Sequence, residues 1–246
     1  MIEFKNLSAG YLRNDFVIKN ADLTLNNGQI TVLLGRNGSG KTTLIKAIMG
    51  EAKTNGDIFI DGEKNIVSRE IALLPQLLPN PSGITVRETV ALGRMPHTGF
   101  FGRLSEKDNE LVDKAILALG LDGLKDKLLT DVSGGERQKA FFAFLVAKDA
   151  KNIILDEPTS NLDTKNKREL FDFIREMKSR GKAILAVLHD VNDALSIADS
   201  ISVISDGKTV FFGNTDEFIK SGIAEKEFGL KPVAADCNGK KQIFFI

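Results

Sequence analysis

The sequence is poor in residues that cross-link a chain. Its 246 residues include one cysteine, Cys237, two histidines and no tryptophan. One cysteine cannot form an internal disulfide, and three Cys and His residues far apart in the sequence do not match a structural zinc site. A chain of this length buries enough apolar surface to fold without such links.

Net charge and long apolar runs are also missing. Lys plus Arg and Asp plus Glu both number 33, so the formal net charge is zero. The chain therefore has no overall electrostatic attraction to nucleic acid or to an anionic membrane. The longest apolar run, residues 140–147, is far shorter than the roughly 20 residues that span a bilayer, and the first residues lack the form of a signal peptide. We expect a chain that does not itself cross a membrane and binds no nucleic acid.

What is present is an alternation of buried-type strands and amphipathic helices. Strands are predicted at 30–34, 71–74, 153–155 and 183–188, and helices at 110–119, 135–148, 165–180 and 191–198. Continuous apolar strands between helices predict an α/β fold with a parallel sheet covered on both faces. Short strands and tight turns before it predict an N-terminal antiparallel β subdomain. We expect residues 1–246 to form one domain with an inserted α-helical subdomain at 77–150 and, beyond 232, a last strand at 242–246.

The strongest motif is a glycine-rich loop between the strand 30–34 and a helix that begins near Thr42. It matches G-x-x-x-x-G-K-[ST] in full. Glycines let backbone N–H groups turn toward a phosphate, and the helix N-terminus adds partial positive charge. Lys41 is expected at the β- and γ-phosphates and Thr42 at Mg²⁺. The predicted phosphate-binding residues are Gly35, Arg36, Asn37, Gly38, Ser39, Gly40, Lys41, Thr42 and Thr43.

A second motif is a pair of carboxylates after the strand 153–155. Asp156 is predicted to hold the magnesium shell, and Glu157 to orient or deprotonate an attacking water. Alone, such a pair is equally typical of a solvated strand end. Downstream of a phosphate loop, it favours a nucleotide hydrolase.

A third motif, Val132-Ser133-Gly134-Gly135-Glu136, is another glycine-rich turn that opens a helix and hence a second anion cradle. The three motifs together resemble the ATPase subunit of ABC transporters, and the resemblance extends over about residues 2–230. It implies a P-loop NTPase core of the RecA-like type and an enzyme that hydrolyses ATP with Mg²⁺. Val132 and Glu136 depart from the usual leucine and glutamine of the signature, but Ser133 and both glycines are kept.

The resemblance also implies roles for four residues outside these motifs. Tyr11 matches the aromatic residue that stacks on adenine, and Gln76 matches the glutamine that contacts the metal and water. His189 matches the histidine at the γ-phosphate and is, with Glu157, an expected catalytic residue. Asp163 belongs to a D-loop, Ser160-Asn161-Leu162-Asp163.

Two copies that face each other head to tail are the assembly that this resemblance implies. ATP held by Lys41 of one copy is closed over by Ser133, Gly134, Gly135 and Glu136 of the other. This arrangement explains why one chain carries two anion cradles so far apart in sequence.

A segment after Gln76 indicates which subgroup of ABC ATPases the chain resembles. Residues 91–97, Ala-Leu-Gly-Arg-Met-Pro-His, and residues 99–105 are similar to a segment of the ATPases of iron-siderophore, haem and cobalamin importers. That similarity implies two integral-membrane permease subunits, an extracytoplasmic substrate-binding protein and a peripheral place at the cytoplasmic face of the membrane. We expect the segment to dock the permease, with Arg94 and Arg103 among its contacts.

Other functions share parts of this pattern. An importer ATPase for another substrate, or a soluble ABC ATPase of iron–sulfur cluster assembly, would carry the same motifs. A chromosome-maintenance ATPase would place a long heptad coiled coil between the two cradles, and the sequence has no sustained heptads there. A translation-type factor would carry two cassettes, and an exporter would usually carry a fused membrane domain.

Overall fold

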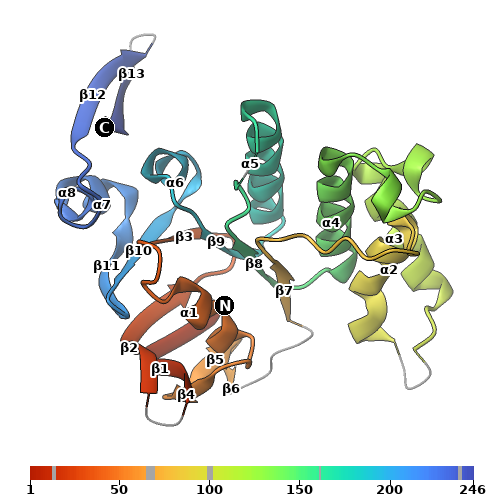
Figure 1. The fold of residues 1–246 in the computed structure, drawn as a ribbon, viewed down its shortest axis with the longest axis horizontal. Helices are drawn as coiled ribbons and strands as arrows, with labels where there is room; N and C mark the ends of the chain where they lie inside the picture. Colours follow the sequence, from red (N-terminus) through yellow and green to blue (C-terminus); the bar gives the residue numbers. More distant parts are fainter. Residues whose placement is uncertain (13–14, 65–69, 99–101, 161, 238–239) are drawn as a thin grey trace.

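The computed structural model describes residues 1–12, 15–64, 70–98, 102–160, 162–237 and 240–246. In these residues the chain forms a six-stranded sheet, a five-stranded sheet, a two-stranded hairpin and a group of helices (Figure 1). No helix among them is both long and apolar enough to pass through a bilayer.

The six-stranded sheet is the centre of the molecule. Its order is β11 (Lys208–Asn214), β10 (Ser200–Ser205), β3 (Ile30–Leu34), β9 (Ala183–Val187), β8 (Asn152–Asp156) and β7 (Ile71–Leu74). The strands from β10 to β7 pair in parallel, and β11 is an antiparallel edge strand. All five residues of β3 and of β9 are buried. The predicted parallel sheet with both faces covered is confirmed.

Alternate residues of these strands face two different layers, as the pleat requires. One face, which includes Leu33 and Leu185, packs on α1 (Lys41–Ile48) and on the antiparallel sheet. The other face, which includes Val32 and Ala186, packs on helices from the rest of the chain. These are chiefly α4 (Gly134–Lys148), α5 (Thr164–Ser179), α6 (Val191–Ile197), α7 (Thr215–Lys220) and α8 (Ile223–Phe228).

The N-terminal part forms the expected antiparallel sheet. Its strands are β1 (Ile2–Leu12), β2 (Asp15–Leu25), β4 (Lys53–Asn55), β5 (Ile58–Ile60) and β6 (Glu63–Lys64). β1 pairs with β2, β4 and β5, all antiparallel. The sheet packs on α1, and Val17 and Ile18 of β2 lie next to Gly40 in the loop that precedes this helix.

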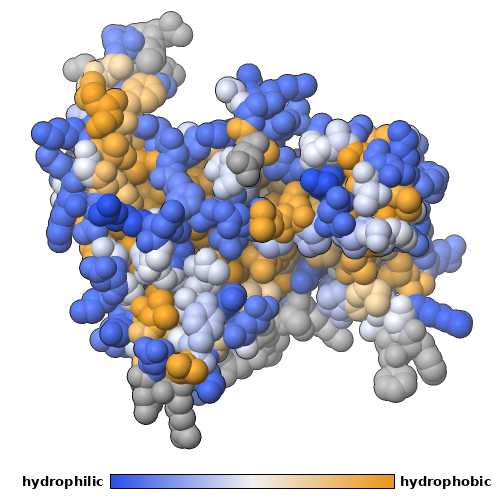
Figure 2. Space-filling model, viewed as in Figure 1, coloured by the Kyte–Doolittle hydropathy of each residue, from blue (hydrophilic) through white to orange (hydrophobic). Residues whose placement is uncertain are grey.

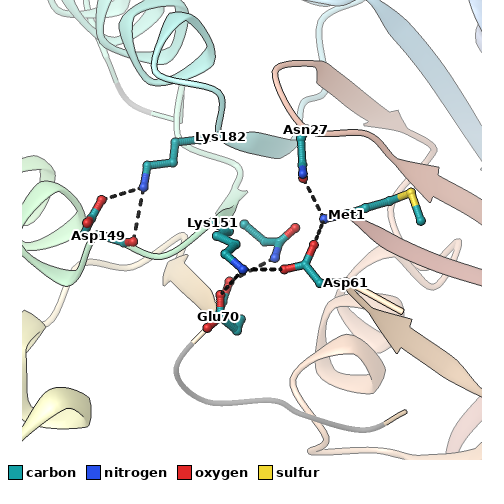
Figure 3. Close-up of polar contacts among 8 residues, drawn as sticks. Met1, Asn27, Asp61, Glu70, Asp149, Lys151 and Lys182 are labelled. Atoms are coloured by element: carbon teal, nitrogen blue, oxygen red, sulfur yellow. Dashed lines mark hydrogen bonds and ion pairs between the residues drawn. The ribbon is translucent and has the colours of Figure 1, made fainter. Parts of the chain in front are cut away.

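Polar contacts fix this sheet to the N-terminal end of the parallel strands (Figure 3). Asp61, in the turn after β5, accepts from the amino group of Met1 at 2.5 Å and faces Lys151 Nζ at 3.4 Å. Lys151, directly before β8, also lies 3.8 Å from Glu70 Oε2. The contacts lie at the opposite end of the parallel strands from the loop between β3 and α1, so they brace the fold away from that loop.

The chain between β7 and β8 is helical. It contains α2 (Val86–Ala91), the 3₁₀ helix η1 (Leu92–His97), α3 (Glu106–Ala118), two 3₁₀ turns, η2 (Asp122–Leu124) and η3 (Leu129–Asp131), and α4. The three α-helices begin at Thr85, Ser105 and Ser133, each of which forms a capping box with the acidic residue at N3. This segment forms the right-hand part of the molecule in Figure 1.

The C-terminal region has more structure than its sequence pattern predicts. Helices α7 and α8 follow β11, and the expected single strand at 242–246 is one half of a hairpin, β12 (Pro232–Cys237) and β13 (Lys240–Phe245). The hairpin projects from the rest of the chain (Figure 1). The Asn192 amide binds both backbone groups of Phe245, with Nδ2 to the carbonyl oxygen at 3.0 Å and Oδ1 to N–H at 2.8 Å. A side-chain clamp from a distant helix leaves no periodic signal in the sequence.

Candidate active site

The glycine-rich loop leads from the buried strand β3 into α1. Gly38 and Gly40 adopt φ values of 80° and 108°, which residues with a side chain larger than hydrogen rarely adopt. A Cβ on Gly35 would lie 2.5 Å from the carbonyl oxygen of Ile204 and 2.6 Å from Ser39 Oγ. Two of these glycines are thus required by backbone conformation and one by close packing. The predicted strand–loop–helix context of the motif is confirmed.

Lys41 lies inside the loop. Its side chain is buried, and Nζ donates to the carbonyl oxygens of Gly35 at 2.8 Å and Arg36 at 3.1 Å. Burial lowers the pKa of Lys41, while the charges of Glu157 and Asp156 oppose that shift. Ser39 Oγ is buried and has no hydrogen-bond partner within the described residues. The loop therefore holds a buried cation together with a buried hydroxyl that lacks a described partner.

Glu157 is the point on which the polar contacts converge. Gln76 Nε2 donates to Glu157 Oε2, and His189 Nε2 lies 2.6 Å from Glu157 Oε1. These residues directly follow three neighbouring parallel strands, since Gln76 comes after β7, Glu157 after β8 and His189 after β9. Ligand sites of open α/β sheets form at the carboxyl ends of the strands. The topology brings together three residues that lie far apart in the sequence.

Asp156, the last residue of β8, lies beside this group. Burial and then the charge of Glu157 raise the pKa of Asp156, and Lys41 and His189 oppose the shift. Two adjacent carboxylates thus meet one buried ammonium and one imidazole. This arrangement suits a site that receives a divalent cation with its phosphates.

A cavity of about 530 Å³ connects these groups. It is lined by Tyr11, Val17, Asn37, Gly38, Gly40, Lys41, Thr42, Thr43, Gln76, Glu157 and His189. Most of the residues expected to hold one nucleotide therefore line one cavity. Asp156 does not line it, but its charge acts on Lys41, which does. Their individual roles stay predictions.

Tyr11 stands at the mouth of that cavity. Its ring is 49% exposed, its hydroxyl lies 3.3 Å from Thr43 Oγ1, and Lys46 Nζ lies 5.2 Å from the ring centroid. The sequence motifs include neither Lys46 nor Val17, which also lines the cavity. Helix spacing indicates that Lys46 lies near this site, because residues 43 and 46 share one face of α1.

Oxygen ligands for a cation come from few protein groups. Within the described residues, no cluster of three or more Asp, Glu, His or Cys side chains could hold a metal ion. The predicted ligands Thr42, Gln76 and Asp156 offer a hydroxyl, an amide and a carboxylate, which is a set for a cation that brings phosphate oxygens and water with it.

The signature motif does not line this cavity. Ser133 caps α4 by accepting from Glu136 N–H at 3.3 Å, while Glu136 Oε2 accepts from Ser133 N–H at 2.8 Å. This contact lowers the pKa of Glu136. Gly134 and Gly135 line a separate cavity of about 270 Å³ that shares Gln76 and Glu157 with the first. Glu136, which stands in place of the usual glutamine, forms a capping box with Ser133.

The D-loop region leads into α5. Asp163 is the N-cap of α5 and accepts from Asn166 N–H at 2.7 Å. Asn161 of the predicted motif lies outside the described residues. Asp163 does not line the nucleotide cavity.

The segment expected to dock a membrane subunit divides into inner and outer residues. Arg94 is buried, and its Nε donates to Asp108 Oδ1 and its Nη1 to the carbonyl oxygen of Ala147, both at 2.9 Å. The prediction that Arg94 is a docking contact on the surface is therefore wrong. Leu92 and Met95 are 50% and 46% exposed, and Arg103 is exposed. Residues 99–101 of the predicted segment lie outside the described residues.

The loop, the carboxylate pair and the parallel sheet define the class of the protein as a P-loop nucleotide hydrolase. The family described as ABC transporter matches residues 18–160. The achromobactin transport ATP-binding protein of Dickeya dadantii is 34% identical, over 99% of this chain and 91% of the relative. The ferric enterobactin transport ATP-binding protein of Escherichia coli K12 is also 34% identical, over 94% of this chain and 88% of the relative.

A solved structure agrees with these relatives. A protein described as an inward-facing conformation of a putative metal-chelate type ABC transporter superposes with a TM-score of 0.87 at 27% identity, over 100% of this chain and 96% of that one. The chain belongs to the ATP-binding proteins of ABC transporters. It is an ATPase coupled to transport, and ATP is its substrate.

Proposed function

We propose that this chain is the ATP-hydrolysing subunit of an importer for iron–siderophore chelates. The observation that carries the catalytic part is the meeting of Gln76, Glu157 and His189 beside the glycine-rich loop. The substrate class is supported by relatives at about one-third identity whose names refer to achromobactin and ferric enterobactin. Haem and cobalamin are the other substrates that the segment 91–97 suggests.

In this proposal the cavity holds ATP in a fixed direction. Tyr11 stacks on adenine, the loop 35–43 binds the phosphates, and Lys41 turns from the loop carbonyls to the β- and γ-phosphates. Thr42, Gln76 and Asp156 hold Mg²⁺, which supplies positive charge to the phosphate oxygens.

Glu157 then acts as the general base. Its carboxylate accepts a proton from the water that attacks the γ-phosphate, and Gln76 and His189 fix its orientation through both oxygens. His189, which donates from Nε2 to Glu157, is close enough to the cavity to contact the γ-phosphate as well.

The signature belongs to the ATP of a second copy. A Cβ on Gly134 would meet no described atom within 4 Å, and one on Gly135 only Asn166 Oδ1 at 3.9 Å. Neither glycine has a positive φ among the described residues. Nothing among the described residues requires glycine there, which supports the close approach of another molecule. We infer a head-to-tail homodimer in which Ser133, Gly134, Gly135 and Glu136, with Asp163 nearby, close over the partner's ATP.

The segment 77–150 is then a helical subdomain inserted in a single domain of 246 residues, and its outer residues meet the membrane subunits. Exposed Leu92 and Met95 offer apolar contacts, and Figure 2 shows apolar side chains at the surface of this part of the molecule. Two integral-membrane permease subunits and an extracytoplasmic binding protein complete the system. The chain lies against the cytoplasmic face of the membrane.

Uptake in a deletion strain tests this function. We expect loss of ferric siderophore uptake, with recovery on expression of the unmodified chain or of Glu51→Gln, an exposed control, but not of Glu157→Gln. Uptake of haem and cobalamin is measured in the same strains. Normal uptake of all three without a redundant transporter contradicts the substrate class, and copurification with iron–sulfur assembly proteins in place of membrane proteins contradicts the importer.

A further inference from the structure

The C-terminal end of α4 is held by side chains from the neighbouring segment η1. Arg94 Nη1 donates to the carbonyl oxygen of Ala147, and His97 Nε2 lies 3.0 Å from that of Lys148. A Cβ on Gly93 would lie 2.6 Å from the carbonyl oxygen of Phe144. Glycine, arginine and histidine of η1 therefore all contact the last turn of one helix.

These contacts match the chemistry of a helix end. The last four carbonyl groups of an α-helix have no partner within the helix, and this end carries partial negative charge. A carbonyl oxygen only accepts, so His97 carries its proton on Nε2. On the other side, Lys182 Nζ donates to Asp149, the C-cap of α4, at 2.6 Å to Oδ1 (Figure 3).

The opposite end of the same helix is the signature. α4 has 15 residues and begins at Ser133, so about 21 Å of helix separates Gly134 from Lys148. Phe142 stacks on Phe173 of α5 with ring centroids 4.5 Å apart, so the helix is also packed along its length. Because α4 is one unbroken helix, the position of its last turn and the position of the signature are coupled.

We propose that His97 is a positioning residue that couples the docking segment to the ATP site through α4. The inference rests on the proposed function, because η1 is displaced only if a membrane subunit contacts Leu92 and Met95. Arg94 is buried in an ion pair with Asp108 and donates to the carbonyl oxygen of Ala147 as the inner contact between η1 and α4. His97 is exposed, and its hydrogen bond is the outer contact between η1 and α4. Loss of that bond loosens the outer end of η1 from α4, while Arg94 still holds its inner part.

The test uses the complex of this chain with its copurified membrane subunits in phosphatidylcholine vesicles. The measured quantity is the coupling ratio, which is the ATPase rate of the complex divided by that of the isolated chain. We expect His97→Ala to lower this ratio roughly two- to tenfold, the range for one hydrogen bond. ATP affinity, isolated ATPase rate and copurification yield stay unchanged.

Conservative variants separate positioning from packing. His97→Gln keeps an N–H donor near the place of Nε2 and restores the ratio, whereas His97→Asn is too short and does not. Thr98→Ala, which removes a hydroxyl bonded only to Met95 within the segment, is the matched control.

Three results overturn the inference: an unchanged ratio, equal losses in the isolated chain and the complex, or loss of copurification, which would mean that His97 contacts the membrane subunit directly. If the unmodified chain copurifies with no membrane protein, the proposed function fails, and the inference fails with it.

Discussion

At the residue scale, the proposed chemistry depends on how Glu157 is held. Glu157 has a φ of 48°, a backbone conformation that residues other than glycine seldom adopt. That turn follows β8 directly and directs the carboxylate toward Gln76 and His189 and not along the strand. Asp156, one residue earlier, remains in the strand and half buried. Two adjacent carboxylates thus receive different surroundings, which suits different roles.

The first prediction concerns this residue. Glu157→Gln keeps the shape of the side chain but cannot accept a proton, so we expect ATP hydrolysis to fall by roughly 10²–10⁴-fold. ATP binding is kept, because one negative charge less faces the γ-phosphate. Phosphate release and nucleotide affinity are measured in parallel with Glu51→Gln. Turnover at the unmodified rate would exclude Glu157 as the base.

The residue motifs of this site could be read from the sequence because each is local. The motif at 35–42 predicts a strand before it and a helix after it. Ser133 and Glu136 predict the capped start of α4. A single sequence does not give the order of strands β7, β8 and β9 in the sheet. It therefore could not predict that Gln76, Glu157 and His189 contact one another. Lys46 belongs to no motif. Helix spacing places it on the same face of α1 as Thr43, but its closeness to Tyr11 comes from the packing of β1 on α1.

At the element scale, η1 and α3 are joined by a buried ion pair. Asp108 Oδ1 accepts from Arg94 Nε at 2.9 Å, and its Oδ2 accepts from Ser105 Oγ at 2.6 Å and Ser105 N–H at 3.0 Å. The hydrogen bond from Ser105 is the largest cause of a fall in the pKa of Asp108 from 3.8 to about 2, with Arg94 adding to it against burial. One carboxylate thus serves as helix cap and as partner of a buried cation.

The second prediction follows from that pair. Asp108→Asn leaves Arg94 buried without its charge partner, so we expect the free energy of unfolding at pH 7 to fall by about 3 kcal/mol. A carboxylate whose pKa is lowered by folding stabilises the protein above pH 3.8, and the effect is lost as the pH falls toward 2. The difference between variant and unmodified chain should therefore shrink below about pH 4.

Urea unfolding at pH 7, 5 and 3 checks this prediction. Asp113→Asn is the matched control, because Asp113 is 57% exposed in its side chain and pairs with Arg87 at the surface. Surface pairs contribute little. An Asp108→Asn chain as stable as the unmodified one at pH 7 would show that the ion pair is not needed.

The helices and strands also show which features the sequence patterns predict and which they do not. Strands 30–34 and 71–74 and the helix at 135–148 were predicted within a residue, because continuous apolar runs and capped amphipathic runs are distinct. The hairpin β12–β13 was predicted only as one strand, since Phe245 owes its position to Asn192. Arg94 was misplaced on the surface because arginine is rarely buried, and its partner Asp108 lies on another helix.

At the scale of the whole molecule, two glycine-rich turns serve two cavities. The loop at 35–42 lines one, and Gly134 and Gly135 line the other. In a head-to-tail dimer each ATP would lie between Lys41 of one copy and Ser133 of the other. A two-fold interface of this kind creates two equal composite sites.

The third prediction uses two chains with different defects. Lys41→Ala removes the ammonium at the phosphates, and Ser133→Arg places a bulky side chain where the partner's ATP must approach. Each variant alone should be inactive, because both composite sites of its homodimer are defective. In an equal mixture about half of the dimers are mixed, and each has one intact site, so independent sites should recover about a quarter of the unmodified ATPase rate.

Nucleotide stoichiometry distinguishes a shared site from sites that must hydrolyse together. Adding Glu157→Gln to both chains should preserve binding and stop turnover, so an isolated mixed dimer should retain one ATP, whereas the Glu157→Gln homodimer should retain two. If the homodimer with Ser133→Arg and Glu157→Gln retains no ATP, one bound ATP in the mixed dimer without recovered hydrolysis would mean that the composite site forms and that the two sites depend on each other. A mixed dimer that retains no ATP would contradict the sharing of Lys41 and Ser133 between copies, and the open space around Gly134 would need another explanation.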